Sequence, residues 1–337
     1  MVIIIILDFT ASCFQEVFIF LKKNCNDCNG TLTYCLKEQK IKKINTMKIV
    51  IKLGFAALLS MHFMTATAQN KNTDNDNSLL WEVSGNGLSK PSYITGTFHI
   101  LCNKDFDIKP KIWNALNASE NFVMEINYTD QNEMMAMQKM MAADKKISEQ
   151  LTPAEATELN KTLADYGTNL KNVDGQSPQA LYALVATKAI PCPANEVKMY
   201  EIELLKTALK NKKSVNGLEK VDDQIYAIGK AYNLKEVISQ LKLGNEYAIA
   251  AQKMTEAFKN ENLKNLDILI KDPKFMNKSQ EKLVLTDRNK KWAEKMPEMM
   301  KNQSSFFAVG SGHLWGENGL INLLKAKGYT VKPVSNL

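Results

Sequence analysis

Two histidines in this chain of 337 residues stand in the same local pattern. Each follows a β-rich run and a glycine three positions earlier: "YITGTFH" contains Gly96 and His99, and "FAVGSGH" contains Gly310 and His313. Glycine at the end of a strand allows a turn closed to other residues and lets the backbone pass close to a bound group. Because imidazole binds several divalent transition metals, two histidines at neighbouring strand ends could hold one ion between them.

A carboxylate would complete such a site, and Glu125 in "FVMEIN" is the best candidate. It ends an otherwise apolar run, where burial of a charge is costly without a cation or another partner. Each feature also has a structural explanation. A single histidine after a glycine turn is more often a capping or core residue than a ligand, and Glu125 could pair with a lysine or a helix start. The pattern shared by both histidines favours the functional interpretation.

The elements around these residues predict a sheet assembled from both ends of the domain. "LLWEVSG" and "PSYITGTFHIL" predict a β-hairpin, and "IWNALNAS" followed by "NFVMEINY" adds a helix and a buried strand. Near the end, "SFFAVGSGH" predicts a buried strand, "GLINLLKAKG" a short helix and "YTVKPV" a closing strand. The two Gly-x-x-His motifs are therefore expected at one junction, at the carboxyl ends of strands.

The middle of the chain, about 129–300, predicts helices almost throughout. Thr152, Pro153 and Glu155 form a capping box with proline at the first helical position, and Ser177 with Pro178 repeats the cap and the proline. We therefore expect an α/β (α+β) fold. Its central sheet is built from the N- and C-terminal parts of the mature chain, with a large helical insertion between them, in a single domain over 79–337.

The first 78 residues divide into three segments. Residues 1–46 differ from the rest and are expected to be a non-native or mis-started extension before Met47. Residues 47–68 have the pattern of a secretory signal peptide, with a basic start, an apolar stretch and a small-residue cleavage site, Ala66-Thr67-Ala68. Residues 69–78 are polar and suit a linker. The alternative for residues 1–68 is a real N-terminal domain or a membrane anchor. We expect an exported protein, periplasmic or secreted.

Charge and motifs exclude several classes of function. From residue 69 onward 35 basic and 32 acidic residues remain, and a net charge near +3 argues for no particular partner. No basic patch is interleaved with aromatic residues and no later apolar run could span a bilayer, so nucleic-acid binding and a stable membrane span are not expected. HExxH, GxSxG and Walker motifs are absent, which disfavours helix-borne zinc proteases, serine hydrolases of the usual form and P-loop enzymes.

The cysteines fit an exported protein. Four of the six lie before Met47, so the mature chain keeps Cys102 and Cys192. Two cysteines in an exported chain most often pair, which predicts a disulfide between the segment after His99 and the helical middle. The alternative is a reactive or metal-bound thiol.

A methionine-rich stretch, "MMAMQKMMAA", also requires an explanation. Its five methionines fall within about two turns of a predicted helix: Met134, Met135, Met137, Met140 and Met141. Thioethers can bind copper(I) or line an adaptable apolar groove. Without another soft ligand nearby, core packing or a flexible cover over the site is the favoured interpretation.

Together the motifs resemble a known family. "YITGTFHILC" and "FFAVGSGHLWGENGLINLLKAKGYTV" are similar to the paired Gly-x-x-His motifs of the TraB/GumN family, whose animal relatives include the Tiki metalloproteases. The resemblance spans residues 79–335. "FVMEIN", "VNGLEKVDDQ" and "LTDRNKKWAEKM" also fit, although each is weak alone.

The resemblance implies a divalent-metal site, with manganese, cobalt, iron and zinc left open. His99 and His313 would be ligands, and Glu125 the third ligand or the general base. Glu219 is a possible further acid or a helix cap. Arg288 and Asn289 could steady a carbonyl or an oxyanion, or belong to a charged helix face.

Two functions remain open. The first is an exported metal-dependent hydrolase, metallopeptidase-like, with a peptide or protein substrate. The alternative is a non-catalytic binding protein that sequesters a peptide or an iron-containing ligand through the same residues and the Met-rich helix. The sequence does not determine the oligomeric state.

Overall fold

A computed structural model describes residues 77–143 and 145–335. The expected extension, signal segment and most of the linker lie outside the described residues. None of the described helices is long and apolar enough to cross a membrane.

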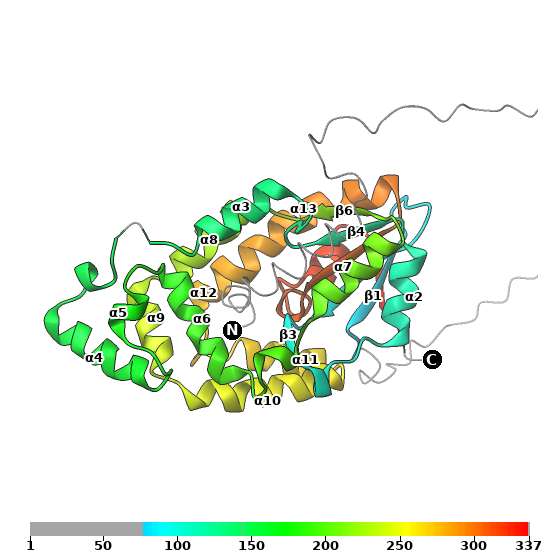
Figure 1. Ribbon diagram of the computed structural model, residues 1–337. Coiled ribbons are helices and arrows are strands. Elements are labelled where there is room, and N and C mark those ends of the chain that lie inside the picture. Colours follow the sequence, from blue (N-terminus) through cyan, green and yellow to red (C-terminus); the bar gives the residue numbers. More distant parts are fainter. Residues whose placement is uncertain (1–76, 144, 336–337) are drawn as a thin grey trace, which may run out of the picture. The chain divides into compact units, whose positions relative to one another are not determined.

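The centre of the described fold is a six-stranded sheet in the order β6-β4-β7-β2-β1-β8. Four neighbouring strands, β6, β4, β7 and β2, run parallel, while β1 pairs antiparallel with both β2 and β8. The strands are β1 (Leu80–Ser84), β2 (Ser92–Thr97), β4 (Asn121–Met124), β6 (Ser214–Gly217), β7 (Ser305–Gly310) and β8 (Thr330–Pro333). The predicted α/β fold with a sheet drawn from both ends is confirmed (Figure 1).

The two Gly-x-x-His motifs end neighbouring parallel strands. In the register of β2 and β7, Gly96 lies opposite Val309 and Thr97 opposite Gly310. All residues of β4 and β7 are buried, because helices cover both faces of this part of the sheet, as parallel sheets require. Gly96 is closely packed: a Cβ there would lie 2.9 Å from Leu314 Cδ1, so that side chain would have to shift.

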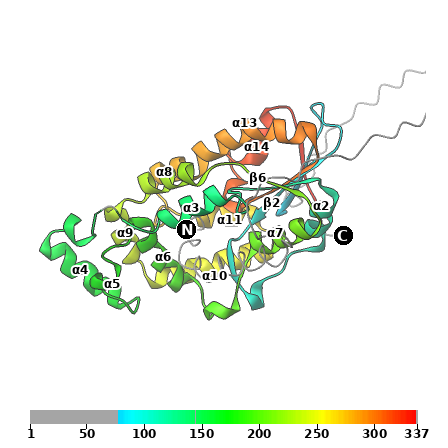
Figure 2. The same ribbon diagram turned by 45° about the horizontal axis from the view of Figure 1, so that its top comes forward.

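The helices fall into two groups. On one face of the sheet α2 (Pro110–Ala118) packs against α7 (Tyr200–Lys210), and on the other α13 (Asp287–Asn302) packs against α14 (Leu320–Ala326) (Figures 1 and 2). The rest form the helical insertion, in which α6 contacts α9 and α10. These are α3 (Gln131–Lys139), α4 (Pro153–Ala164), α5 (Leu170–Val173), α6 (Pro178–Ala189), α8 (Val221–Ala231), α9 (Leu234–Leu241), α10 (Asn245–Lys259), α11 (Leu263–Ile270) and α12 (Lys278–Glu281).

Two strands interrupt the segment that was predicted to be helical. β6 extends the central sheet beside β4, and β5 (Val197–Met199) pairs antiparallel with β3 (Ile100–Cys102) in a separate two-stranded sheet. The "SVNG" of β6 carries no apolar alternation, so its strand state depends on pairing with β4 and cannot be predicted from local periodicity.

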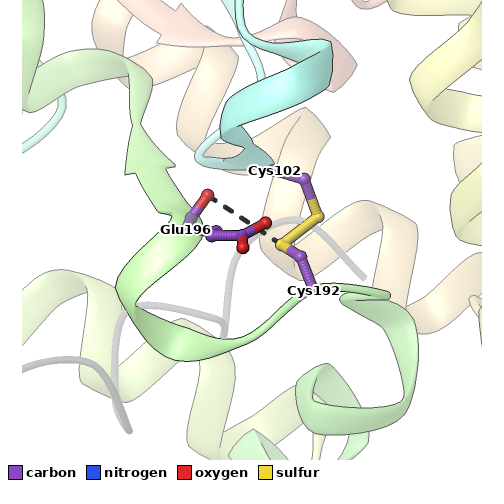
Figure 3. The surroundings of a disulfide bond; sticks show 3 residues. All are labelled: Cys102, Cys192 and Glu196. Atoms are coloured by element: carbon purple, nitrogen blue, oxygen red, sulfur yellow. Dashed lines mark hydrogen bonds between the residues drawn. A yellow bond between two sulfur atoms is a disulfide. The ribbon is translucent and has the colours of Figure 1, made fainter.

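A disulfide joins Cys102 at the end of β3 to Cys192 in the loop after α6, with 5.9 Å between the Cα atoms (Figure 3). Glu196 lies beside the bond, on the segment that leads into β5 (Figure 3). The two cysteines are therefore a structural link between the sheet region and the helical insertion, and neither is a free thiol.

Removal of this link should destabilise the protein. The bond closes a loop of 90 residues, and closing such a loop restricts the unfolded chain. We expect Cys102→Ser/Cys192→Ser to lower the free energy of unfolding by about 2–4 kcal/mol in urea denaturation. Reductant should lower the stability of the parent to the same level and leave the double variant unchanged. A parent insensitive to reductant would show that the bond contributes nothing.

Candidate active site

The four parallel strands end at one edge of the sheet, and each is followed by a side chain that could do chemistry. His99 follows β2, Glu125 follows β4, Glu219 follows β6, and His313 ends the short 3-10 turn after β7, Ser311–His313. All four are at most 8% exposed. Ligands of open α/β sheets gather at this carboxyl edge, so the topology brings together residues that are more than 200 positions apart.

Glu125 lies at the centre of this group. Its Oε1 accepts a hydrogen bond from the backbone N–H of Gly310 at 2.8 Å. Its Oε2 accepts from Arg288 Nη2 at 2.6 Å and from Gln224 Nε2 at 3.4 Å. Burial raises the pKa of this carboxyl, but Arg288 and the two histidines outweigh burial and hold it at about 2. Glu125 is therefore a fixed negative charge at neutral pH.

Arg288 joins the two buried carboxylates. Its Nη2 also donates to Glu219 Oε1 at 2.6 Å, and its Nε lies 3.0 Å and 3.1 Å from the two Glu219 oxygens. The residue is 3% exposed and lies two positions after a π-helical turn, Lys282–Thr286, whose Val284 carbonyl accepts from Nη1. Such turns are frequent at functional sites. Burial lowers the pKa of the guanidinium, but the two carboxylates raise it more, so the charge is kept.

His313 is held as a neutral imidazole. Its Nδ1 lies 2.6 Å from Asn289 Oδ1, which can only accept, so the proton is assigned to Nδ1. Its Nε2 then faces Arg288 Nη1 at 3.2 Å and Glu125 Oε1 at 3.8 Å, and its ring packs against Trp292. Burial lowers the pKa of His313 and the Arg288 charge lowers it further, to about 3.

His99 has the opposite electrostatic environment. Its Nδ1 hydrogen-bonds to Glu201 Oε1, which also accepts from the Thr97 hydroxyl. Burial lowers the pKa of His99, but the charge and hydrogen bond of Glu201 outweigh burial and raise it. The ring therefore points its Nε2 into the site, because its Nδ1 is occupied by a carboxylate.

Three side chains converge on one glycine. A Cβ on Gly310 would lie 3.3 Å from Glu125 Oε1, 3.5 Å from His99 Nε2 and 3.7 Å from His313 Cδ2. Any larger residue would occupy the space between them. The glycine of the second motif is thus explained by close approach of site groups.

The donor set fits a divalent transition ion in its chemistry. Two imidazoles and one carboxylate face the same space, and each histidine has its Nδ1 fixed by another side chain, as metal ligands commonly do. In the present arrangement Arg288 occupies His313 Nε2, and no three His, Cys, Asp or Glu side chains of the described residues already have metal-ligand spacing. An ion bound at His313 Nε2 would have to replace the hydrogen bond from Arg288.

The structure brings together all six residues predicted for the site, but their contacts differ in kind. His99, Glu125, His313 and Arg288 face the shared space or bond directly to groups there. Glu219 is enclosed by Arg288, Gln224 and the Trp292 indole N–H rather than capping a helix. The side-chain Nδ2 of Asn289 donates hydrogen bonds to the backbone carbonyls of His313 and Asn318.

Glu201 was not predicted from the sequence, and Gln224 entered only as the last residue of the "VNGLEKVDDQ" motif, without a role. Glu201 lies in the first turn of α7 and is 5% exposed, and its Oε2 has no hydrogen-bond partner among the described residues. The available signal was a glutamate between Tyr200 and Ile202 on the buried face of an amphipathic helix. Such a residue is identifiable only once the helix face is known.

The methionine-rich segment lies outside this group. It forms most of α3 and the turn after it, where only Met137 of the five methionines is buried and Met135 is 52% exposed. Packing in the core therefore accounts for Met137 but not for the other four methionines. α3 contacts α8, and Glu133 accepts from the N–H of Val221 at the start of α8, the helix that carries Gln224.

Comparison with known proteins agrees with the motifs. The sequence model of the TraB/PrgY/gumN family matches residues 79–333, which confirms the resemblance. The chain is 22% identical to metalloprotease TIKI1 of Xenopus tropicalis over 84% of this chain and 66% of that protein. It is 19% identical to TIKI1 of Danio rerio, over 76% and 63%, and 22% identical to TIKI2 of Xenopus tropicalis, over 78% and 61%. The chain thus spans less than two thirds of these relatives, and no solved structure matches it.

Loss of the Arg288 charge should destabilise the fold. Arg288→Met leaves two buried carboxylates without their cation, and breaking a buried ion pair from one side costs about 3–5 kcal/mol. We expect a loss of this size in urea denaturation at pH 7. Lys290→Met is the matched control, because it removes the same charge from an exposed position of α13. Equal, small losses in both variants would contradict a central role for Arg288.

The pKa values of the two histidines should be shifted in opposite directions from the ordinary value. In metal-free protein, NMR of the imidazoles should show His313 neutral from pH 8 to 5, and His99 titrating above its ordinary value near 6.5. His313→Gln assigns the neutral signal, and Glu201→Gln should lower the pKa of His99.

Unfolded His313 protonates near pH 6.5 but folded His313 only near 3, so its contribution to stability decreases as pH falls between these values. A folded His313 that protonates near 6.5 would contradict this environment.

Proposed function

The chain belongs to the TraB/PrgY/gumN family, and on that premise we propose that it is an exported metal-dependent hydrolase that cleaves peptide bonds. The observation that carries the proposal is the convergence of His99 Nε2, Glu125 Oε1 and the His313 ring on Gly310. Its relatives TIKI1 and TIKI2 are metalloproteases, which favours a peptide bond as the target.

His99, His313 and Glu125 would hold the ion. A bound divalent ion supplies a Lewis acid and lowers the pKa of water to about 7. Between the two roles open to Glu125, the contacts favour the ligand role. Both of its oxygens already accept hydrogen bonds, from Gly310 and Arg288, and such bonds make a carboxylate a weaker base.

The remaining residues orient these groups and supply charge. Arg288 carries a fixed guanidinium beside His313 Nε2, where its N–H groups could donate to a substrate carbonyl or an oxyanion. Glu219 holds that guanidinium in place through Nε and Nη2. Asn289 and Glu201 fix the rings of His313 and His99, so both act as positioning residues.

Export is proposed from the signal-like segment 47–68 and agrees with the disulfide. Disulfides persist in the periplasm and outside the cell and are rare in reducing compartments. The Cys102–Cys192 bond would therefore suit a periplasmic or secreted enzyme.

Metal binding and cleavage test the proposal together. We expect the purified protein to bind one divalent ion of manganese, cobalt, iron or zinc by calorimetry after chelation. His99→Ala/His313→Ala should weaken binding by about 100-fold or more, beyond the effect of losing an outer-shell partner. Glu196→Gln, an exposed carboxylate outside the site, is the control and should bind as the parent does.

Cleavage is measured with a mixed peptide library and mass spectrometry of the products. The loaded parent should cut peptides, and the double variant should not. Peptide capture without cleavage would replace the hydrolase by the alternative, a protein that sequesters its ligand. If none of the four ions binds the parent, the metal-dependent proposal is wrong.

A further inference from the structure

A cavity of about 260 Å³ lies directly beside His99. One wall is the segment from Phe98 through β3, and the opposite wall is the end of α6 with Ile190 and Pro191. α10 closes the cavity with Ala251 and Thr255. The cavity is thus formed where the strand edge, the disulfide-linked loop and the helical insertion meet.

The lining is apolar inside and polar at the mouth. Phe98, Ala189 and Ala251 are buried walls. The charged lining residues are Lys104, Asp105 and Glu256, and Asp105 is already paired with Lys259 at 2.9 Å. The other two carry opposite charges and are exposed, so no unpaired charge of one sign dominates the mouth. Pockets of this construction bind apolar groups and use a few polar atoms for orientation. A charged side chain inside would lack a buried counter-ion, so its burial would be unfavourable.

His99 belongs to both the cavity and the candidate site. It lines the cavity, and its Nε2 lies 3.5 Å from the point near Gly310 on which Glu125 also converges. His99 is the one candidate-site residue in the cavity lining, so a group seated in the cavity would lie beside the residue whose Nε2 faces the site. For a peptide, that group is the side chain of a residue flanking the reacting bond.

We propose that this cavity is the specificity pocket of the enzyme, and that it receives one apolar side chain adjacent to the scissile peptide bond. The inference rests on the proposed function. The volume decides the size of the group: pockets for whole drug-sized ligands run from about 300 to 1,000 Å³, so this cavity suits a single side chain such as leucine, methionine or phenylalanine.

The disulfide keeps the pocket in shape. Cys102 lines one wall, and Cys192 directly follows Pro191 of the other. A covalent link between the walls reduces the ordering that binding would otherwise require, so the pocket is pre-formed. The substrate class is accordingly a peptide with an apolar residue at the cleaved bond.

Blocking the pocket is the test. Thr255→Phe places an aromatic ring in the cavity from a half-exposed position of α10, and Lys253→Phe adds the same ring to an exposed position of α10 outside the cavity. In the peptide library, the parent should enrich leucine, methionine or phenylalanine at one position flanking the cut. Thr255→Phe should lower kcat/KM for those peptides by about 10-fold or more, and less for alanine or glycine there. Lys253→Phe should match the parent.

A second readout separates this inference from the proposed function. N-acetyl-leucinamide binding to metal-free protein, followed by NMR, should be present in the parent and in Lys253→Phe and lost in Thr255→Phe. Binding with this pattern but without peptide cleavage by the parent would retain the pocket and reject the hydrolase. Cleavage with unchanged preference in Thr255→Phe would reject the pocket alone. If Thr255→Phe does not fold, Gln252→Trp at the exposed mouth provides the same comparison.

Discussion

The buried guanidinium of Arg288 is the interaction on which the rest of the site depends. A cation this far from water is stable only with matched partners, and here Glu125 and Glu219 supply them from the ends of two adjacent strands. The same side chain reaches His313 Nε2 and the Val284 carbonyl. One group therefore connects α13, its π-helical turn, β4, β6 and the turn after β7, and fixes the relative positions of the groups proposed to act on a substrate.

This arrangement explains why the helical insertion and the sheet form one site. The parallel strands deliver His99, Glu125, Glu219 and His313 to a common edge, and without further cover that edge would face water. Helices of the long middle segment close the edge, and α11 and the π-helical turn contact the turn that carries His313. Low solvent access strengthens charge interactions, so the insertion is part of the electrostatics of the site as well as its cover.

Much of the site could be predicted from the sequence because its main residues end strands. Gly96 with His99 and Gly310 with His313 are local patterns, and a glutamate after an apolar run is conspicuous. Glu201, the role of Gln224 and β6 could not be found in this way. A polar residue on an amphipathic helix gives the same sequence pattern whether it faces water or a buried imidazole. An edge strand of four residues is too short for a period-two pattern to be recognised between predicted helices. Their roles depend on tertiary pairing.

The short β3–β5 ladder connects the candidate site to the cavity beside His99. Its register places Ile100 opposite Met199, and the Tyr200 N–H donates to the His99 carbonyl, which brings Glu201 to the ring it orients. The residues of β3 also line the cavity, and the disulfide ties the end of that strand to the opposite wall. Movement of this ladder would therefore change the direction of His99 Nε2 and the width of the pocket together. In the proposed enzyme, a side chain seated in the pocket would therefore lie beside an imidazole whose orientation the same ladder sets.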